Sequence, residues 1–337
     1  MPNIMLTYRC NLNCSYCFAN EFVNHSRTDI SMSNFDKAIR FLTASGPTHV
    51  GLIGGEPTLH PEFKLILEKL INNRDITSVT IYTNGILLDK FINQLVHPKF
   101  RILVNCNAPT MIGERNFDIT KKNLDTLFFD YYMKDRINLG INLYSNDMDY
   151  SFILELLQRY SLHRVRISTT VPDFSVENDI AVIDYFKEKK PFLMKFFKDL
   201  DNIQVMPYYD CNKPPYCIWD DEEKEWLTNF VKKYGVRETD LIGHHSKCYP
   251  VIDILPDLKA VRCLGMSDFC KVDLEQFDNF TEIASYFLNY VDADAYKILA
   301  DSQCSNCKQT QTRNCMAGCL GFKSKQIHAC NQFCMNL

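Results

Sequence analysis

The chain has 337 residues, of which 46% are hydrophobic and 23% are charged, so its composition is that of a globular protein and excludes a disordered one. Its formal net charge of -4 gives no broad basic surface for nucleic acid or for an anionic membrane. The first residues do not resemble a secretory signal, and no run reaches the ~20 apolar residues that cross a bilayer. We therefore expect a cytoplasmic protein with no nucleic-acid or membrane partner.

Fifteen cysteines are unusual in a chain of this expected location. Cytosolic thiols stay reduced, and an odd number of them cannot all pair as disulfides, so metal binding is the better interpretation. Their distribution supports it, because three lie within residues 10–17 and eight of the nine from Cys248 onward fall into spaced groups. The remaining four are isolated in the sequence, and they are Cys106, Cys211, Cys217 and Cys270.

Residues 1–205 alternate short runs rich in β-branched side chains with longer amphipathic segments. Such alternation predicts an α/β fold with a parallel sheet, which we expect to form a partial (β/α)6 barrel of the TIM type. In such a fold the chemistry lies at the carboxyl ends of the strands. The expected strands are 3–8, 49–53, 78–83, 100–105, 138–144, 164–169 and 203–207.

Helices are expected wherever apolar side chains repeat at intervals of three and four residues. The first such pattern, at Phe35, Ala38, Ile39 and Leu42, follows Ser33, a candidate N-cap. The other expected helices are 62–73, 119–133, 151–160, 221–234, 281–289 and 293–300.

The pattern changes after residue 205. Residues 206–221 contain Pro207, Pro214 and Pro215 among aromatic side chains, which predicts an irregular connection. The last part of the chain is rich in cysteine and poor in apolar periodicity, so we expect metal clusters to stabilise it. The expected domains are a core barrel at 1–205, a bridging region at 206–245 and a small cysteine-rich, cluster-binding domain at 246–337.

Three cysteines follow directly on the first expected strand, with the spacing Cys10-x3-Cys14-x2-Cys17. Three thiolates on one loop can bind three irons of a [4Fe–4S] cluster, which normally takes four cysteines. The fourth iron then stays open, and an open metal position is where a substrate or cofactor binds. The alternative is a zinc site completed by a distant side chain such as His25.

With Tyr16 before its last cysteine, this motif resembles the signature of the radical S-adenosylmethionine (SAM) superfamily. The resemblance extends over about the first 205 residues. It implies that the open iron chelates the amine and carboxylate of SAM. It also implies that the reduced cluster cleaves SAM to methionine and a 5′-deoxyadenosyl radical, with an electron donor of the ferredoxin or flavodoxin type.

Two turns at the ends of later strands support the resemblance. Residues 54–57, Gly-Gly-Glu-Pro, resemble the family's loop that contacts the SAM amine. There the glycines permit a close approach of the backbone, and Glu56 can accept hydrogen bonds from an ammonium group. Residues 83–85, Thr-Asn-Gly, resemble a triplet that the family often has near SAM, although alone this is also an ordinary turn.

Polar side chains also end the later strands. Asn105 ends the fourth expected strand, where related enzymes often place a serine or asparagine near the ribose, and Asn142 and Arg166 lie on the fifth and sixth. The alternative is that such asparagines satisfy backbone groups inside the barrel. The residues that we expect to contact SAM are Tyr16, Gly54, Gly55, Glu56, Pro57, Thr83, Asn84, Asn105, Asn142 and Arg166.

The C-terminal cysteines have the spacing Cys248-x14-Cys263, Cys304-x2-Cys307-x7-Cys315-x3-Cys319 and Cys330-x3-Cys334. This spacing resembles the SPASM extension of radical SAM enzymes, which carries two auxiliary [4Fe–4S] clusters in sulfatase-maturing enzymes and peptide maturases. The resemblance implies that the first auxiliary cluster is bound by Cys248, Cys263 and Cys319. It implies that the second is bound by Cys304, Cys307, Cys315 and one of Cys330 and Cys334.

The C-terminal part departs from the family pattern in three respects. Leu258 stands where the family usually has glycine, and the gap before Cys315 is seven residues instead of five. The first auxiliary cluster also lacks an obvious fourth ligand: Cys217, Cys211 or Cys270 completes it, or the site is open to substrate. Two structural zinc ribbons are the alternative.

These features together predict hydrogen abstraction from unactivated carbon, for which the protein positions SAM and substrate. The SPASM resemblance implies a peptide or protein substrate whose side chain is oxidised or crosslinked, as in maturases of ribosomally made peptides or sulfatases. Nine residues precede Cys10, so we expect no separate recognition domain before the barrel. The alternatives are radical SAM oxidation of a small-molecule metabolite and a non-enzymatic zinc-binding scaffold. The sequence identifies no general base.

Overall fold

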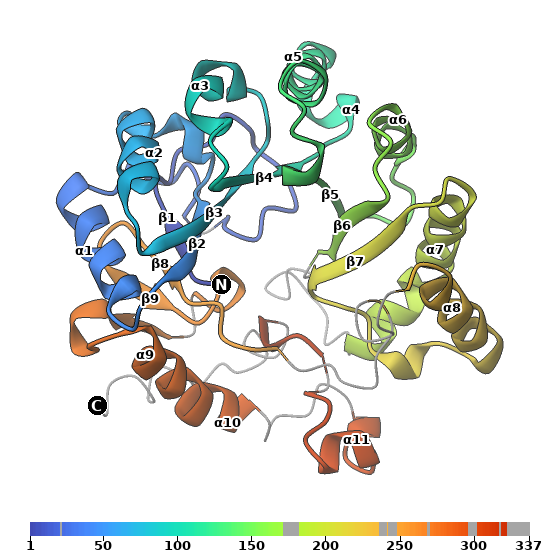
Figure 1. Ribbon diagram of the computed structural model, residues 1–337. Helices are drawn as coiled ribbons and strands as arrows, with labels where there is room; N and C mark the ends of the chain where they lie inside the picture. Colours follow the sequence, from blue (N-terminus) through green and yellow to red (C-terminus); the bar gives the residue numbers. More distant parts are fainter. Residues whose placement is uncertain are drawn as a thin grey trace. The chain divides into compact units, whose positions relative to one another are not determined.

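The chain forms two compact units in the computed structural model (Figure 1). The first combines Met1–Leu139 with Pro250–Leu288, and the second combines Gly140–Tyr249 with Asn289–Cys330. Within the described residues, no helix is long and apolar enough to cross a membrane. The structure describes residues 1–20, 22–170, 182–235, 241, 248–267, 270–295, 302–316 and 318–321.

Parallel strands joined by helices form the centre of the first unit, as the alternating sequence pattern predicts. Neighbouring strands pair in the order of the chain, with Met5 opposite Ile53 and Leu52 opposite Ile81. These side chains are buried, which is typical of a parallel sheet covered on both faces. The strands are β1 (Asn3–Met5), β2 (Thr48–Ile53), β3 (Ile76–Thr83) and β4 (Phe100–Asn105).

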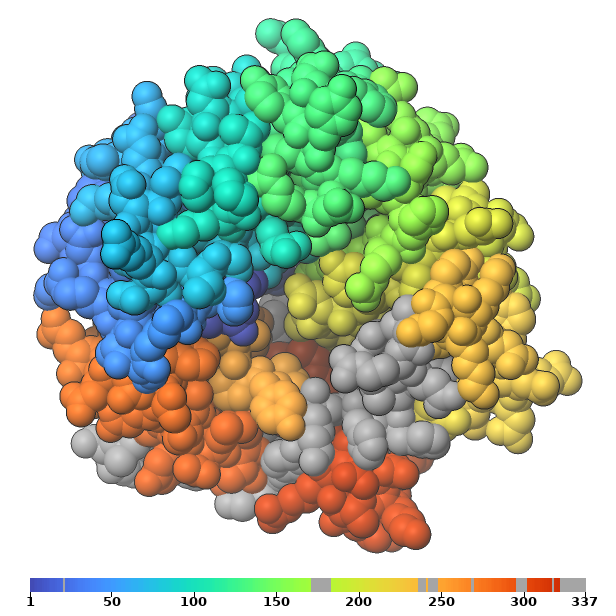
Figure 2. Space-filling model, in the orientation of Figure 1, coloured from blue at the N-terminus to red at the C-terminus, as the bar shows by residue number. Residues whose placement is uncertain are grey.

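Helices flank this sheet in Figure 1, and in Figure 2 the residues coloured blue to cyan form a continuous surface. Helix α1 begins directly after its N-cap, Ser31, whose hydroxyl accepts a hydrogen bond from the Asn34 N–H at 3.1 Å. The prediction of Ser33 as the N-cap was therefore wrong, because Ser33 already lies inside the helix. The helices are α1 (Met32–Thr43), α2 (Phe63–Asn72), α3 (Ile92–Leu95), α4 (Pro109–Ile112) and α5 (Glu114–Asp125), which continues as a π-helix over Thr126–Asp130.

The C-terminal part of the first unit extends the same sheet. Strand β9 (Lys259–Val261) pairs antiparallel with both β8 (Asp253–Ile254) and β10 (Lys271–Asp273). Strand β8 also pairs parallel with β1, which was not predicted from the sequence. Helix α9 (Phe280–Tyr286) follows, and it continues as a π-helix over Phe287–Asp292.

A buried polar contact fastens β8 to β1. The Asn3 amide donates to Asp253 Oδ1 at 2.6 Å, and the Leu264 N–H donates to Asp253 Oδ2 at 2.7 Å. Gly51 on β2 leaves the space for it, since a Cβ there would lie 1.9 Å from the Asn3 side-chain oxygen. Burial raises the pKa of Asp253 to about 6, although both hydrogen bonds lower it.

The second unit also has parallel strands, with helices beside them in Figure 1. The last strand begins at Met206 instead of at the predicted residue 203, because the preceding helix runs to Asn202 and Gln204 then turns with φ +59°. That helix was not predicted, and it contains Pro191 in its interior. The elements are β5 (Ile137–Leu143), α6 (Ser151–Arg159), β6 (Arg164–Thr169), α7 (Val182–Asn202), β7 (Met206–Cys211), α8 (Asp221–Lys233) and α11 (Lys308–Gln311).

Two predictions for the later chain have mixed outcomes. The expected irregular connection at 206–221 begins with β7, so only its later residues fit that description. The helix expected at 293–300 is helical over Ala293–Ala295, and the rest lies outside the described residues.

Candidate functional site

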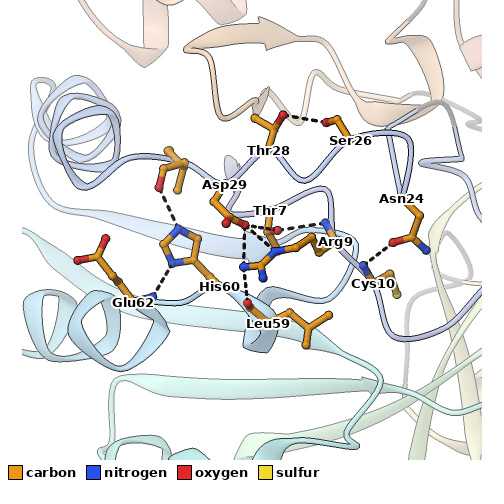
Figure 3. Close-up of polar contacts among 11 residues, drawn as sticks. Thr7, Arg9, Cys10, Asn24, Ser26, Thr28, Asp29, Leu59, His60 and Glu62 are labelled. Carbon is orange, nitrogen blue, oxygen red and sulfur yellow. Dashed lines mark hydrogen bonds and ion pairs between the residues drawn. The ribbon is translucent and has the colours of Figure 1, made fainter.

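The loop after β1 carries the first three cysteines, all of them partly buried. Its backbone turns twice, because the Cys17 N–H donates to the Cys14 carbonyl at 3.1 Å and the Asn20 N–H donates to the Cys17 carbonyl at 3.2 Å. The start of the loop is fixed by Asn24, whose side-chain oxygen accepts the Cys10 N–H at 2.9 Å (Figure 3). The three thiols thus sit on one folded loop at the carboxyl end of a strand.

The electrostatics of the three thiols favour a bound cation. The pKa of each of them is raised, mainly by burial, and that of Cys10 reaches about 12, to which the nearby Glu56 and the other two thiols contribute. A thiol becomes a metal ligand only as a thiolate, so the positive charge of an iron–sulfur cluster would stabilise it here. In the part of the chain that the structure describes, no three His, Cys, Asp or Glu side chains are grouped to hold one ion. A cuboidal cluster instead binds each thiolate at a separate iron, so the cysteine loop fits such a cluster.

Arg9 and Asp29 form an ion pair next to Cys10, at the start of the loop (Figure 3). Arg9 donates from Nε to Asp29 Oδ1 at 3.0 Å and from Nη2 to the Leu59 carbonyl at 2.6 Å. Thr7 Oγ1 donates to the same Asp29 oxygen at 2.6 Å and accepts the Arg9 N–H at 3.0 Å. These residues tie the start of the cysteine loop to the turn after β2, and none of them was predicted as part of the site.

The Gly-Gly-Glu-Pro turn lies directly against the cysteine loop. The Gly55 N–H donates to the Thr7 carbonyl at 2.8 Å, and the Glu56 N–H donates to the Arg9 carbonyl at 2.8 Å. A Cβ on Gly55 would lie 2.4 Å from the Arg9 carbonyl oxygen and 3.0 Å from Cys10 Cβ. A Cβ on Gly54 would lie 2.9 Å from the Thr7 carbonyl oxygen. Both positions therefore require glycine, because the backbones of the two loops are in contact.

The Glu56 carboxylate is 1% exposed and joins the ends of β2 and β3. Its Oε1 accepts hydrogen bonds from the Thr58 N–H at 3.2 Å, the Thr58 hydroxyl at 2.6 Å and the Thr83 hydroxyl at 2.7 Å. Its Oε2 accepts the Asn84 N–H at 2.8 Å. Burial raises the pKa of Glu56, and these donors lower it. Protein donors thus surround the carboxylate that we expected to accept hydrogen bonds from SAM.

Residues at two other strand ends also contact the cysteine loop. The Asn84 amide donates to Asn11 Oδ1 at 2.7 Å, and the Tyr16 hydroxyl hydrogen-bonds to Asn107 Oδ1. The Asn105 side-chain oxygen is buried and has no hydrogen-bond partner among the described residues. The cysteine loop therefore lies beside the ends of both β3 and β4 within the first unit.

The other two predicted SAM contacts meet in the second unit. Asn142 on β5 is the register partner of Ser168 on β6, and the two side chains hydrogen-bond. Arg166 Nη1 donates to both of them at 3.2 Å, and Arg166 Nε lies 3.7 Å from Asp210 Oδ2. These residues form a polar cluster on β5, β6 and β7.

The C-terminal cysteines divide between the units. Cys263 and Cys270 belong to the first unit, and Cys330 and Cys334 lie outside the described residues. The second unit contains the others, which are Cys211, Cys217, Cys248, Cys304, Cys307, Cys315 and Cys319.

Comparison with protein families identifies the domain that carries the first site. Residues 4–127, which lie in the first unit, match the family model of the Radical SAM superfamily. A probable GTP 3′,8-cyclase of Methanococcus aeolicus is 29% identical over 245 residues, which are 69% of this chain and 72% of that protein. The molybdenum cofactor biosynthesis protein moc-5 of Caenorhabditis elegans is 30% identical over 153 residues, which are 43% of this chain and only 25% of that protein.

A solved structure resembles nearly the whole chain. It is native anSMEcpe with bound AdoMet and the Kp18Cys peptide, with a TM-score of 0.65 and 16% identity over 98% of this chain and 92% of that one. At this identity the likeness shows the fold alone. It confirms the predicted α/β class with a partial barrel.

Proposed function

We propose that this chain is a radical SAM enzyme that holds a [4Fe–4S] cluster on Cys10, Cys14 and Cys17. The observation that carries the proposal is the packing of the cysteine loop against the turn at Gly55, within the domain that matches the superfamily. When bound, the cluster supplies the electron that cleaves SAM to methionine and a 5′-deoxyadenosyl radical, which abstracts hydrogen from the substrate.

The residues of the chain position the reactants. Arg9 and Asp29 fix the start of the loop whose three thiols would hold the cluster. Glu56 fixes the ends of β2 and β3 through its hydrogen bonds to Thr83 and Asn84. Polar groups at these strand ends then line the space where SAM would bind, and a fixed arrangement lowers the entropy that binding costs.

We propose a peptide or protein as the substrate and oxidation or crosslinking of one of its side chains as the reaction. Two observations support this substrate class. The anSMEcpe structure, with the same fold over 98% of this chain, holds a peptide together with AdoMet. In addition, the second unit gathers several cysteines, as expected for auxiliary clusters that accept an electron after hydrogen abstraction. A ferredoxin or flavodoxin would supply the electron for SAM cleavage.

The second candidate is a small-molecule substrate, and the names of the sequence relatives support it. The similar proteins of Methanococcus aeolicus and Desulforamulus reducens are a probable and a named GTP 3′,8-cyclase, and the latter is 23% identical over 242 residues. A purine nucleoside triphosphate is therefore the small molecule to test.

The experiment is anaerobic incubation of the reconstituted protein with SAM and dithionite, with chromatographic measurement of 5′-deoxyadenosine. We expect its formation in the wild type and its loss in Cys14→Ala, while the variant remains folded. Retained formation in Cys14→Ala would contradict the assignment of the cluster. Deuterated GTP and a deuterated, cysteine-containing peptide library are then added separately. The substrate is the one that increases the formation of 5′-deoxyadenosine and transfers deuterium to it.

A further inference from the structure

We infer that Lys189 binds an anionic group of a ligand, a carboxylate or a phosphate, at the carboxyl ends of β5 and β6. The binding site is argued from contacts within the second unit alone. Its assignment to the substrate rests on the proposed function, because a peptide side chain and a nucleoside triphosphate can both present such a group.

Lys189 lies on the buried face of α7. It is 4% exposed, and Phe186 and Leu193, three residues before it and four residues after it, are fully buried. Residues at this spacing share one face of a helix. A lysine on such a face is unusual, because lysine is almost never fully buried unless its charge is paired.

Among the described residues, no carboxylate forms an ion pair with this amine. Lys189 Nζ donates to Asn146 Oδ1 at 3.3 Å and lies 5.2 Å from the centre of the Tyr185 ring. Both contacts are favourable, but both partners are neutral. The carboxylate of Glu188 acts on the amine electrostatically, but Glu188 is exposed, and as the adjacent residue of the helix it faces another direction. An ammonium group has three N–H donors, so this one can serve a further acceptor.

The amine lies at the edge of the second unit where ligands bind in α/β folds. Asn146 comes three residues after the end of β5. The Tyr185 hydroxyl donates at 2.5 Å to the carbonyl of Thr170, the residue directly after β6. The carboxyl ends of parallel strands are the usual place for a substrate. Because the Asn146 side chain that accepts from the amine is exposed, the amine lies close to solvent and a ligand can reach it.

The electrostatics of the amine fit an anionic ligand. Burial lowers the pKa of Lys189, because its charged form is poorly solvated there. A carboxylate or phosphate oxygen would accept hydrogen bonds from the ammonium group and neutralise its charge, and such charge-assisted bonds are stronger than bonds to neutral partners. Without an anion, the buried charge destabilises the fold. Removal of the amine should therefore have opposite effects on stability and on ligand binding.

The first test is urea unfolding of the full chain with Lys189→Met, in a buffer without phosphate. Methionine fills a similar space and carries no charge, so we expect unfolding at a higher urea concentration than in the wild type. The control is Lys195→Met, which removes an exposed lysine of the same helix that lies 5.8 Å from the Tyr150 ring, and we expect it to unfold like the wild type. Unfolding of Lys189→Met at a lower urea concentration would give Lys189 a purely structural role and overturn the inference.

The second test is calorimetric titration with inorganic phosphate, GTP and a short peptide that has one glutamate and blocked ends. We expect Lys189→Met to bind at least one of these anions about tenfold more weakly than the wild type, and Lys195→Met to bind it equally well. The neutral controls are guanosine and the same peptide with glutamine. An effect confined to GTP and phosphate identifies a phosphate ligand, and one confined to the glutamate peptide identifies a carboxylate. Equal affinities of wild type and Lys189→Met for all three anions overturn the inference.

A second variant supplies the missing carboxylate from within the protein. In Asn146→Asp a carboxylate replaces the amide whose oxygen lies 3.3 Å from Lys189 Nζ, so it would pair with the ammonium group. We expect this variant to resist urea better than the wild type and to bind the same anion about tenfold more weakly. Unchanged anion binding in Asn146→Asp contradicts the inference, because an internal carboxylate at this position must compete with the ligand.

These measurements use neither SAM nor dithionite, so they test the anion site separately from the radical chemistry. The assignment to the substrate is tested by the formation of 5′-deoxyadenosine. We expect the substrate concentration for half-maximal formation to rise about tenfold in Lys189→Met and to keep its wild-type value in Lys195→Met. The same concentration in all three proteins would overturn the assignment to the substrate. A wild type that forms no 5′-deoxyadenosine but loses anion binding in Lys189→Met would contradict the proposed function and support the anion site.

Discussion

Four hydrogen bonds hold the buried Glu56 carboxylate between two strand ends, and this changes how its role is understood. The sequence motif implies a contact with the SAM ammonium, whereas the structure gives the carboxylate donors from Thr58, Thr83 and Asn84. Removing a buried acceptor that serves several donors destabilises the fold, because the buried donors are then left without a hydrogen-bond partner and without water. We therefore treat Glu56 as a residue that positions the SAM-binding turns.

The test compares Glu56→Ala with Glu56→Gln. Alanine leaves the buried donors unpaired, and we expect a loss of roughly 2–5 kcal/mol in the free energy of unfolding together with weaker SAM binding. Glutamine keeps one oxygen for the two threonines but places an amide against the Asn84 N–H, so its effects should be intermediate. The measurements are urea unfolding and SAM titration by calorimetry. Wild-type SAM affinity in Glu56→Ala would remove this residue from the site.

Asp253 makes the stability of the first unit depend on pH. Burial raises its pKa from the ordinary 3.8 to about 6. Between these values the native state keeps the proton that the unfolded state has lost, so the free energy of unfolding falls as the pH rises from about 4 to about 6. The size of the effect is on the order of 2–3 kcal/mol.

The expected result is a stability that declines over this pH range in the wild type and changes less in Asp253→Asn. Asparagine cannot titrate, and its amide oxygen can still accept the hydrogen bond from Asn3. Urea unfolding at several pH values between 4 and 7 gives the comparison. If the free energy of unfolding changes equally with pH in both proteins, Asp253 is not the cause of the pH dependence.

At the scale of elements, contact between two turns builds the first site. The cysteine loop after β1 and the Gly-Gly-Glu-Pro turn after β2 exchange backbone hydrogen bonds, and the Arg9–Asp29 pair closes the start of the loop. The loop is therefore shaped by protein contacts before any metal binds, which favours assembly of a cluster at a defined geometry.

Gly55→Ala should disturb this contact. The new Cβ would lie 2.4 Å from the Arg9 carbonyl oxygen, so the two turns must separate. We expect the variant to lose most of the iron of the first cluster and about 1–3 kcal/mol of stability. The matched control is Gly265→Ala, where nothing lies within 4 Å of the added methyl group. Equal iron content in both variants would show that the close contact at Gly55 is dispensable.

Most strands and helices could be predicted from the sequence, whereas the side-chain contacts that support the cysteine loop could not, and both outcomes have physical reasons. Strands β2 and β4 were predicted to within one residue because their apolar runs are short and bounded by turn residues. Helix α7 was missed because Pro191 interrupts its pattern, although tertiary packing of Phe186 and Phe197 keeps the helix. The Arg9–Asp29 pair joins residues with no shared motif. Only the folded chain brings them together.

At the scale of the whole molecule, each compact unit combines stretches that are separated in the sequence. The hairpins after residue 250 join the first unit because β8 pairs with β1, and the Cys304–Cys319 segment joins the second. The expected domains at 1–205, 206–245 and 246–337 remain a prediction. The sets of cysteines expected to bind metal together also remain a prediction, whereas the neighbours of Cys211 and Cys217 depend on the fold and could not be predicted from spacing.

The most direct test of the account is the amount of iron and acid-labile sulfide per chain after anaerobic reconstitution, in the wild type and in the Cys10/Cys14/Cys17→Ala variant. We expect about twelve irons in the wild type and about eight in the variant, which corresponds to one SAM-binding cluster and two auxiliary clusters. Iron that is the same in both proteins, or zinc in place of iron in the wild type, would contradict the radical SAM assignment of the first loop.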